Sequence, residues 1–203
     1  MKETIFETYG RWVAAKSMFH DASHDWIHIQ NVVHNAETIM SSLKLDASTK
    51  EITLYTAVSH ELCDKKYVSN ATESLDDMKT FMHTLNISPH TIECVARVVP
   101  CISFSQRLAT GEPEFEFEEE RIAYWIVSDA DMLESLGATG IVRTFMYQAY
   151  NGYKTAEAYN HCKTRLFKCI NYMHYPYSKT EGAERLARMK RICDELQNER
   201  EFV

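Results

Sequence analysis

Three short polar fragments inside otherwise apolar, helix-forming stretches constrain the fold of this chain most. They are His24-Asp25-Trp26-Ile27-His28, His60-Glu61-Leu62-Cys63-Asp64 and Asp129-Ala130-Asp131-Met132-Leu133. Charged side chains in such stretches are costly unless they are paired or bind an ion. Imidazole nitrogens and carboxylate oxygens are the usual ligands of divalent metals in nitrogen- and oxygen-based sites. The three fragments therefore predict one shared metal site, assembled by tertiary packing inside a helical protein.

The composition favours helices over sheet. The 203 residues include only 6 Gly and 4 Pro, so turn signals are scarce. Hydrophobic residues make up 45% and charged residues 25%, which is ordinary for a globular protein. The length suits one well-buried core. We therefore predict an all-α fold with a single domain over residues 1–203.

The net charge and the cysteine pattern indicate which partners the protein can have and in which cellular compartment it is expected. The net charge of -7 argues against a nucleic-acid backbone as the main partner. The six cysteines form no C-x-x-C pair, which predicts free, mostly buried thiols of a reducing compartment. Residues 1–6 lack the apolar segment of a secretion signal, and no apolar run reaches membrane-spanning length. These features predict a cytoplasmic protein without a membrane partner.

Apolar periodicity and capping signals predict a succession of helices. Their expected ranges are about 3–20, 26–43, 49–63, 72–86, 88–98, 119–136, 139–150, 155–173 and 180–199. His28 shares its face of the second helix with Val32, and His60 and Glu61 fall in the last turn of the third. The acidic segment 111–120 is predicted to be a loop, with a short strand over 114–117 as the alternative.

Several of the polar residues also have simpler interpretations. Asp25 can cap the helix that starts at Trp26, and the lysine pair 65–66 can be a solvated pair near a helix end. Ser103 and Ser105 are typical turn formers. The second fragment also approaches the zinc-peptidase pattern H-E-x-x-H, but Asp64 stands at the fifth position.

The order of the fragments resembles that of the HD-domain metal-dependent phosphohydrolases, an all-helical superfamily. The resemblance is greatest to a bacterial-type branch with the patterns HDWxHxxRV, HDxxDxK, ISFS and DADRLDAxGAxGIxR. This chain reads HDWIHIQNV from His24, HELCDKK from His60, ISFS from Ile102 and DADMLESLGATGIVR from Asp129. The resemblance is strong over 24–143 and continues weakly through 161–166. It implies a helical domain with the metal between core helices and the helices of 155–199 packed on it.

The resemblance implies four metal ligands, His28, His60, Glu61 and Asp131. They would hold one divalent ion, which could be Mn, Fe, Co, Ni, Zn or Mg. Asp129 is a rival to Asp131, because residues two apart on a helix point to different faces and the sequence does not say which faces inward.

The resemblance also implies catalytic roles for three further residues. Asp64 would position or deprotonate the attacking water. Lys66, with Lys65 as second choice, and Arg143 would neutralise phosphate charge. The implied substrate is a phosphorylated small molecule, in the first place a nucleoside triphosphate cleaved at the α–β bond, and a homodimer is left open.

Two departures from the pattern bear on activity. Glu61 stands where the pattern has Asp, and Asn31 stands where it has Arg. A longer carboxylate can still ligate a hard metal, but the position of the bound water can change. The alternative function is therefore a degenerate HD-fold protein that binds or regulates without turnover. A further alternative, an iron-dependent oxygenase, would need histidines for a second metal, and none has matching spacing.

Overall fold

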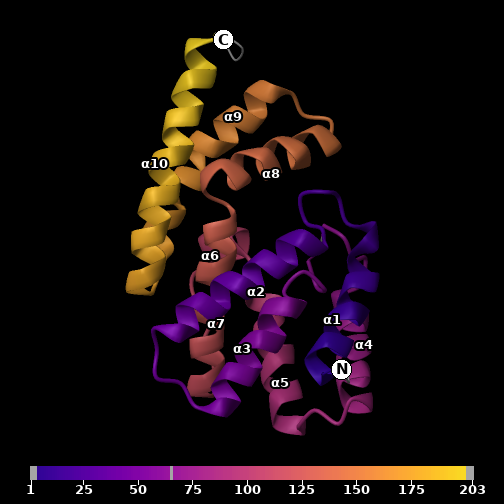
Figure 1. The fold of residues 1–203 in the computed structure, drawn as a ribbon. Coiled ribbons are helices and arrows are strands. Elements are labelled where there is room, and N and C mark those ends of the chain that lie inside the picture. Colours follow the sequence, from indigo (N-terminus) through magenta and orange to yellow (C-terminus); the bar gives the residue numbers. More distant parts are fainter. Residues whose placement is uncertain (1–3, 65, 200–203) are drawn as a thin grey trace.

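The computed structural model describes residues 4–64 and 66–199, and all regular structure in these two ranges is helical. This result confirms the all-α prediction. The α-helices are α1 (Ile5–Lys16), α2 (Trp26–Ser41), α3 (Ala47–Ser59), α4 (Ala71–Thr84), α5 (Pro89–Val98), α6 (Phe104–Thr110), α7 (Glu118–Glu134), α8 (Gly137–Tyr150), α9 (Thr155–Thr164) and α10 (Pro176–Asn198) (Figure 1). Short 3-10 helices cover η1 (Ser17–Phe19), η2 (Val99–Cys101) and η3 (Leu166–Tyr172).

Local capping explains where the helices that carry the site begin. The Asp25 carboxylate accepts hydrogen bonds from the backbone N–H groups of Ile27 and His28, which confirms its capping role at α2. Asp46 caps α3 in the same way. Ser88 caps α5, with Pro89 in the first turn, where a missing N–H costs nothing.

The structure differs from the prediction at several helices. Helix α3 ends at Ser59, so His60 is its C-cap and Glu61 lies beyond its last turn. The helix predicted over 155–173 ends at Thr164 and continues, after Arg165, as η3. Helix α6 was not predicted at all. Ser103, expected to form a turn, caps it by accepting a hydrogen bond from the N–H of Gln106. The acidic segment before α7 contains no strand, so that alternative is wrong.

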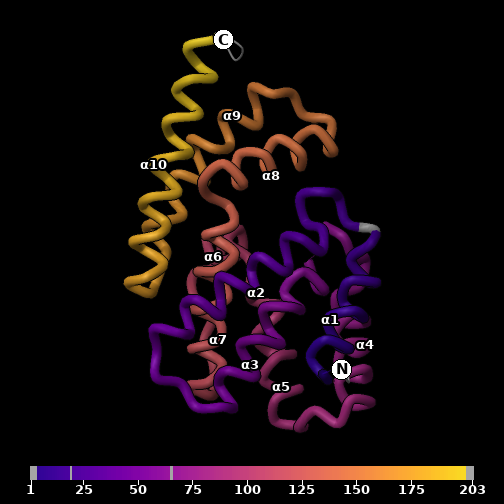
Figure 2. The backbone as a smooth tube through the Cα atoms, in the orientation of Figure 1, coloured from indigo at the N-terminus to yellow at the C-terminus, as the bar shows by residue number. Residues whose placement is uncertain are grey.

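Helices α2, α3 and α7 pack against one another and form the centre of the molecule. Helices α1, α4 and α5 lie on one side of this centre, whereas α8, α9 and the long α10 form a group above and beside it (Figure 1). The chain runs from α7 directly into α8, so α7 connects the two groups (Figure 2).

Two hydrophobic clusters fill the interior. One includes Ala36, Leu133 and Met189 and joins α2, α7 and α10. The other includes Tyr9 and Ile52 and joins α1, α3, α4 and α5. Polar side chains between such clusters are held in place by packing on both sides, which is what a precise site requires.

The prediction of free, mostly buried thiols is confirmed, because all six cysteines are free and all except Cys101 are buried. Within the described residues, no helix has the length and apolar composition needed to cross a membrane.

A candidate metal centre and its cavity

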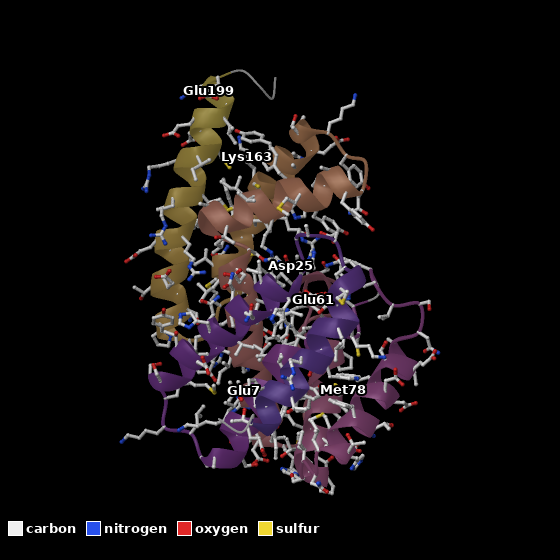
Figure 3. The ribbon with its side chains drawn as sticks, turned by 45° about the vertical axis from the view of Figure 1, so that its right-hand side comes forward. Glu7, Asp25, Glu61, Met78, Lys163 and Glu199 are labelled. Atoms are coloured by element: carbon white, nitrogen blue, oxygen red, sulfur yellow. The ribbon has the colours of Figure 1, made fainter. Side chains whose placement is uncertain are left out.

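The structure brings His28, His60, Glu61 and Asp131 together from three different elements. The Nε2 atom of His28 lies 3.2 Å from Nε2 of His60. It also lies 3.4 Å from Oε1 of Glu61 and 3.5 Å from Oδ1 of Asp131. Oε1 of Glu61 is 3.5 Å from Nε2 of His60. Figure 3 shows Glu61 near the centre of the molecule.

These separations are those of donor atoms around one metal ion. Ligand bonds of about 2.0–2.2 Å in tetrahedral or octahedral geometry place neighbouring donors roughly 3.0–3.5 Å apart. His28, His60 and Asp131 present donor atoms that all lie within 4.8 Å of one another. Two imidazole nitrogens and two carboxylates therefore suit a divalent transition metal.

The second nitrogen of each imidazole faces an oxygen, as is usual for metal-binding histidines. Nδ1 of His60 lies 2.7 Å from the carbonyl oxygen of Ala57, to which it donates when Nε2 carries the lone pair. Nδ1 of His28 lies 3.9 Å from Oε2 of Glu134. The same Glu134 oxygen accepts a hydrogen bond of 3.1 Å from the side chain of Asn31. Asn31 thus supports the carboxylate behind His28.

The centre also contains buried groups that lack a hydrogen-bond partner. In the described part of the chain, neither Oε2 of Glu61 nor Nδ1 of His28 forms a hydrogen bond. Burial raises the pKa of Glu61, but His28 and His60 outweigh burial and hold it well below its ordinary value. A buried carboxylate with a free oxygen between two imidazoles is costly without a cation. The residues present therefore fit a divalent ion.

Asp129 and Asp131 point in different directions. Asp131 reaches the imidazole of His28, whereas the carboxylate of Asp129 accepts hydrogen bonds of 2.9–3.0 Å from the N–H groups of His174 and Tyr175. These N–H groups lie at the start of α10, where a negative charge is favourable. Asp129 therefore holds α10 on α7, and Asp131 is the better candidate ligand.

We expect Asp129→Asn to lower the free energy of unfolding by about 1–3 kcal/mol, because the amide group places N–H donors against buried backbone N–H groups. Its manganese content should not change. Urea unfolding and elemental analysis of the same preparation check both parts. Loss of metal with unchanged stability would make Asp129 the ligand instead of Asp131.

The candidate metal centre opens into a cavity of about 400 Å³. Asp64, Lys66 and Arg143, the three residues predicted to act in catalysis, all line it. Nζ of Lys66 pairs with Oδ2 of Asp64 at 3.1 Å. Desolvation lowers the pKa of Lys66, but the negative charges of Asp64 and Glu61 outweigh this effect and raise the pKa above its ordinary value. Nε of Arg143 donates to the carbonyl oxygen of Ser23 at 2.6 Å. Lys65, the second choice for a phosphate-binding lysine, lies outside the described residues.

One wall of the cavity contains residues to which the sequence analysis gave no role in the site. Arg165 lies just after α9 and donates to the hydroxyl of Ser105. Ser105, expected in a turn, lies instead in the first turn of α6 and lines the cavity. Tyr147, Gln148 and Tyr153 come from α8 and the loop after it. The only signal for this wall was the weak continuation of the resemblance through 161–166.

His24 is a second residue whose place the sequence did not predict. Its Nδ1 lies 2.7 Å from the hydroxyl oxygens of Ser23 and Tyr67, and both hydroxyls donate to the buried carboxylate of Asp21. Each hydroxyl has one proton, so Nδ1 must be the donor to these oxygens. Burial lowers the pKa of His24, which favours the neutral ring, and in that ring Nε2 carries the lone pair. The ring lines the cavity and offers it an acceptor.

Comparisons with known proteins agree with this fold. No family model matches the chain. The uncharacterized protein YpgQ of Bacillus subtilis is 23% identical over 192 residues, which cover 93% of this chain and 90% of YpgQ. The crystal structure of YpgQ in complex with ADP superimposes with a TM-score of 0.77 at 25% identity, covering 96% of this chain and 97% of that one.

Two structures described as HD-superfamily hydrolases show the same fold. One, from Bacillus thuringiensis, has a TM-score of 0.71 at 21% identity and covers 96% of this chain and 95% of that one. The other, a predicted hydrolase from an uncultured Thermotogales bacterium, has a TM-score of 0.60 at 16% identity and covers 96% and 90%. The chain therefore has the all-helical fold of the HD superfamily, and among the solved structures it resembles is YpgQ with bound ADP.

Proposed function

We propose that this protein is a metal-dependent phosphohydrolase that acts on nucleotides and cleaves the α–β bond of a nucleoside triphosphate to release pyrophosphate. One observation carries the proposal. The candidate metal centre opens into a cavity, and the cationic side chains of Lys66 and Arg143 line the wall of that cavity. Anionic substrate oxygens would meet positive charge on both sides, from the ion and from the protein.

The cavity suits a nucleotide in size and in lining. A volume of about 400 Å³ falls in the range of small-molecule sites. Lys66 and Arg143 provide charge for phosphates, and the ring of Tyr153 provides an apolar face of the kind on which bases stack. The ADP in the YpgQ crystal structure supports a nucleotide ligand for the same fold.

In the proposed reaction each residue has a separate task. His28, His60, Glu61 and Asp131 would hold a divalent ion, which would polarise a phosphoryl oxygen and lower the pKa of water. Asp64 orients the attacking water and accepts a proton from it. Lys66 and Arg143 compensate the charge of the phosphates and of the leaving group. The ion pair between Asp64 and Lys66 holds the two side chains next to each other in the cavity wall.

Glu61 belongs to a site that is adjusted to its length. His60 and Glu61 lie beyond the end of α3, and Oε1 of Glu61 still comes within 3.5 Å of both imidazoles. Shortening this side chain by one methylene group would move its oxygen away from the ion.

We therefore expect Glu61→Asp to weaken metal binding and to slow pyrophosphate release, each by about tenfold or more. Rates at saturating metal and metal titrations of both proteins check this prediction. Faster release by the aspartate variant would instead favour a site that has drifted from catalysis, and with it the alternative of a binding or regulatory protein.

The test of the proposed function is a screen of nucleoside triphosphates with several divalent metals. The expected products are a nucleoside monophosphate and pyrophosphate in equal amounts. Chromatography of the nucleotides and a pyrophosphate assay measure both. Orthophosphate with a nucleoside diphosphate would place cleavage at the other bond. Tight nucleotide binding without products would contradict the enzyme assignment.

A further inference from the structure

A second group of potential metal ligands lies far from the cavity, with His90 and Glu119 partly exposed and Cys94 buried. His90 and Cys94 are four residues apart on α5, and Glu119 lies in the first turn of α7. Their donor atoms all lie within 4.8 Å of one another. Asp131 follows Glu119 by twelve residues on α7, so the two clusters are separated by roughly 18 Å along the helix axis. They are separate sites.

The distances within this cluster come close to those of a tetrahedral zinc site. Nε2 of His90 lies 2.8 Å from Oε2 of Glu119 and 3.7 Å from Sγ of Cys94. Zinc bonds of about 2.0–2.3 Å place neighbouring nitrogen, oxygen and sulfur donors roughly 3.3–3.6 Å apart. An ion would thus require movements of about half an ångström, which a half-exposed His90 side chain can make.

From these observations we infer that His90, Cys94 and Glu119 form a second metal site that binds zinc and joins the N-terminal turns of α5 and α7. The spacing of four residues puts the histidine and the cysteine on one face of α5, and α7 supplies the third ligand. The fourth position is left for water. The proposed function does not depend on this site.

Charge and ligand chemistry select zinc for this site. Binding displaces the thiol proton, so the thiolate of Cys94 and the carboxylate of Glu119 together balance the charge of a divalent ion. Burial raises the pKa of the Cys94 thiol to about 11, so without a metal the sulfur is an unreactive thiol. A soft sulfur ligand favours zinc or cobalt over manganese or magnesium.

The neighbouring charges are already paired with each other. Arg97 contacts Sγ of Cys94 at 3.6 Å, but its guanidinium group also pairs with the buried carboxylate of Glu120. The pair of Arg97 and Glu120 is neutral overall, so the second site has room for the two positive charges of the ion. His90 and Glu119 are 48% and 26% exposed, which gives the ion access from solvent.

Cobalt is the most direct probe, because only this site would provide a thiolate. We expect two cobalt ions per chain and a thiolate-to-cobalt charge-transfer band in the near ultraviolet. Cys94→Ser should abolish the band and one of the two ions. His28→Ala with His60→Ala should keep the band, because those residues belong to the other centre. Cys63→Ser and Cys101→Ser are the matched cysteine controls and should also keep it.

Zinc titration by calorimetry supplies an independent measurement. His90→Ala and Cys94→Ser should each lower zinc affinity at this site by at least about a hundredfold, because even outer partners of a ligand change affinity by 10–100-fold. His90 is exposed, so its replacement leaves the packing intact. Circular dichroism of the metal-free proteins verifies folding.

Three results would overturn the inference. They are the absence of a charge-transfer band in the wild type, a band that survives Cys94→Ser, and zinc binding that His90→Ala does not weaken, which would indicate an adventitious ion only. If the protein lacked the proposed phosphohydrolase activity, the cobalt charge-transfer band and the zinc affinity of the second site would remain unchanged, so the two failures can be told apart.

Discussion

His28→Ala combined with His60→Ala is expected to remove the manganese ion of the cavity and to lower pyrophosphate release at least about a thousandfold. The two imidazoles are half of the four proposed ligands, and their Nε2 atoms lie 3.2 Å apart. Without them Glu61 and Asp131 cannot hold the ion alone. Loss of the polarised phosphoryl oxygen and of the activated water removes several kcal/mol of transition-state stabilisation, and each factor of ten is about 1.4 kcal/mol.

Elemental analysis after manganese loading and a pyrophosphate assay measure the two effects. Manganese is the suitable metal, because the sulfur-containing cluster disfavours it. Removal of two buried side chains could also impair folding, so Asp131→Asn is a second variant that keeps the shape of the side chain. It should lose metal, whereas the matched Asp129→Asn should retain it. Equal manganese content in the wild type and the double variant would show that these histidines do not bind the metal.

Asp64→Asn is expected to lower the rate of hydrolysis by about a hundredfold or more at saturating substrate, with metal content and melting temperature nearly unchanged. The amide keeps the shape of the side chain but cannot accept a proton from water. The side chain of Asp64 is partly exposed, so the change has little effect on folding. Steady-state kinetics, metal analysis and thermal unfolding check the three parts.

The ion pair between Asp64 and Lys66 requires a control. If Asp64 acted only by holding Lys66, then Lys66→Met would have an equal effect, and the double variant would be no worse than either single variant. If Asp64 acts on the water, Lys66→Met should chiefly raise KM and Asp64→Asn chiefly lower kcat. Loss of metal in Asp64→Asn would make Asp64 a ligand, and unchanged activity would make it a surface carboxylate.

Most helices could be predicted because their signals are local. Asp25, Asp46 and Ser88 cap helices with neighbours two or three residues away in the chain, and this chemistry is visible in the sequence. The errors occur where long-range contacts decide. The segment of α6 and η3 is held by Arg107, which donates to the carbonyl oxygen of Tyr172, sixty-five residues further along the chain. No pattern within a short window contains that contact.

The candidate site also contains residues that could be predicted from the sequence and residues that could not. Side chains of unusual cost in helical stretches indicated a shared polar centre. The resemblance to the HD-domain phosphohydrolases then implied the four proposed ligands and three residues of the cavity. The motifs did not select Arg165 or the free nitrogen of His24, whose places depend on contacts with Ser105 and with the network of Asp21 and Tyr67.

The choice between Asp129 and Asp131 shows most clearly what the sequence alone cannot predict. The sequence by itself determined that two carboxylates lie on opposite faces of one helix, because the rotation per residue of an α-helix is fixed. Only the tertiary structure decided which face meets His28 and which meets the start of α10. The physical reason is that helical periodicity is a property of the backbone, whereas the direction in which a face points is set by the packing of helices far apart in the chain.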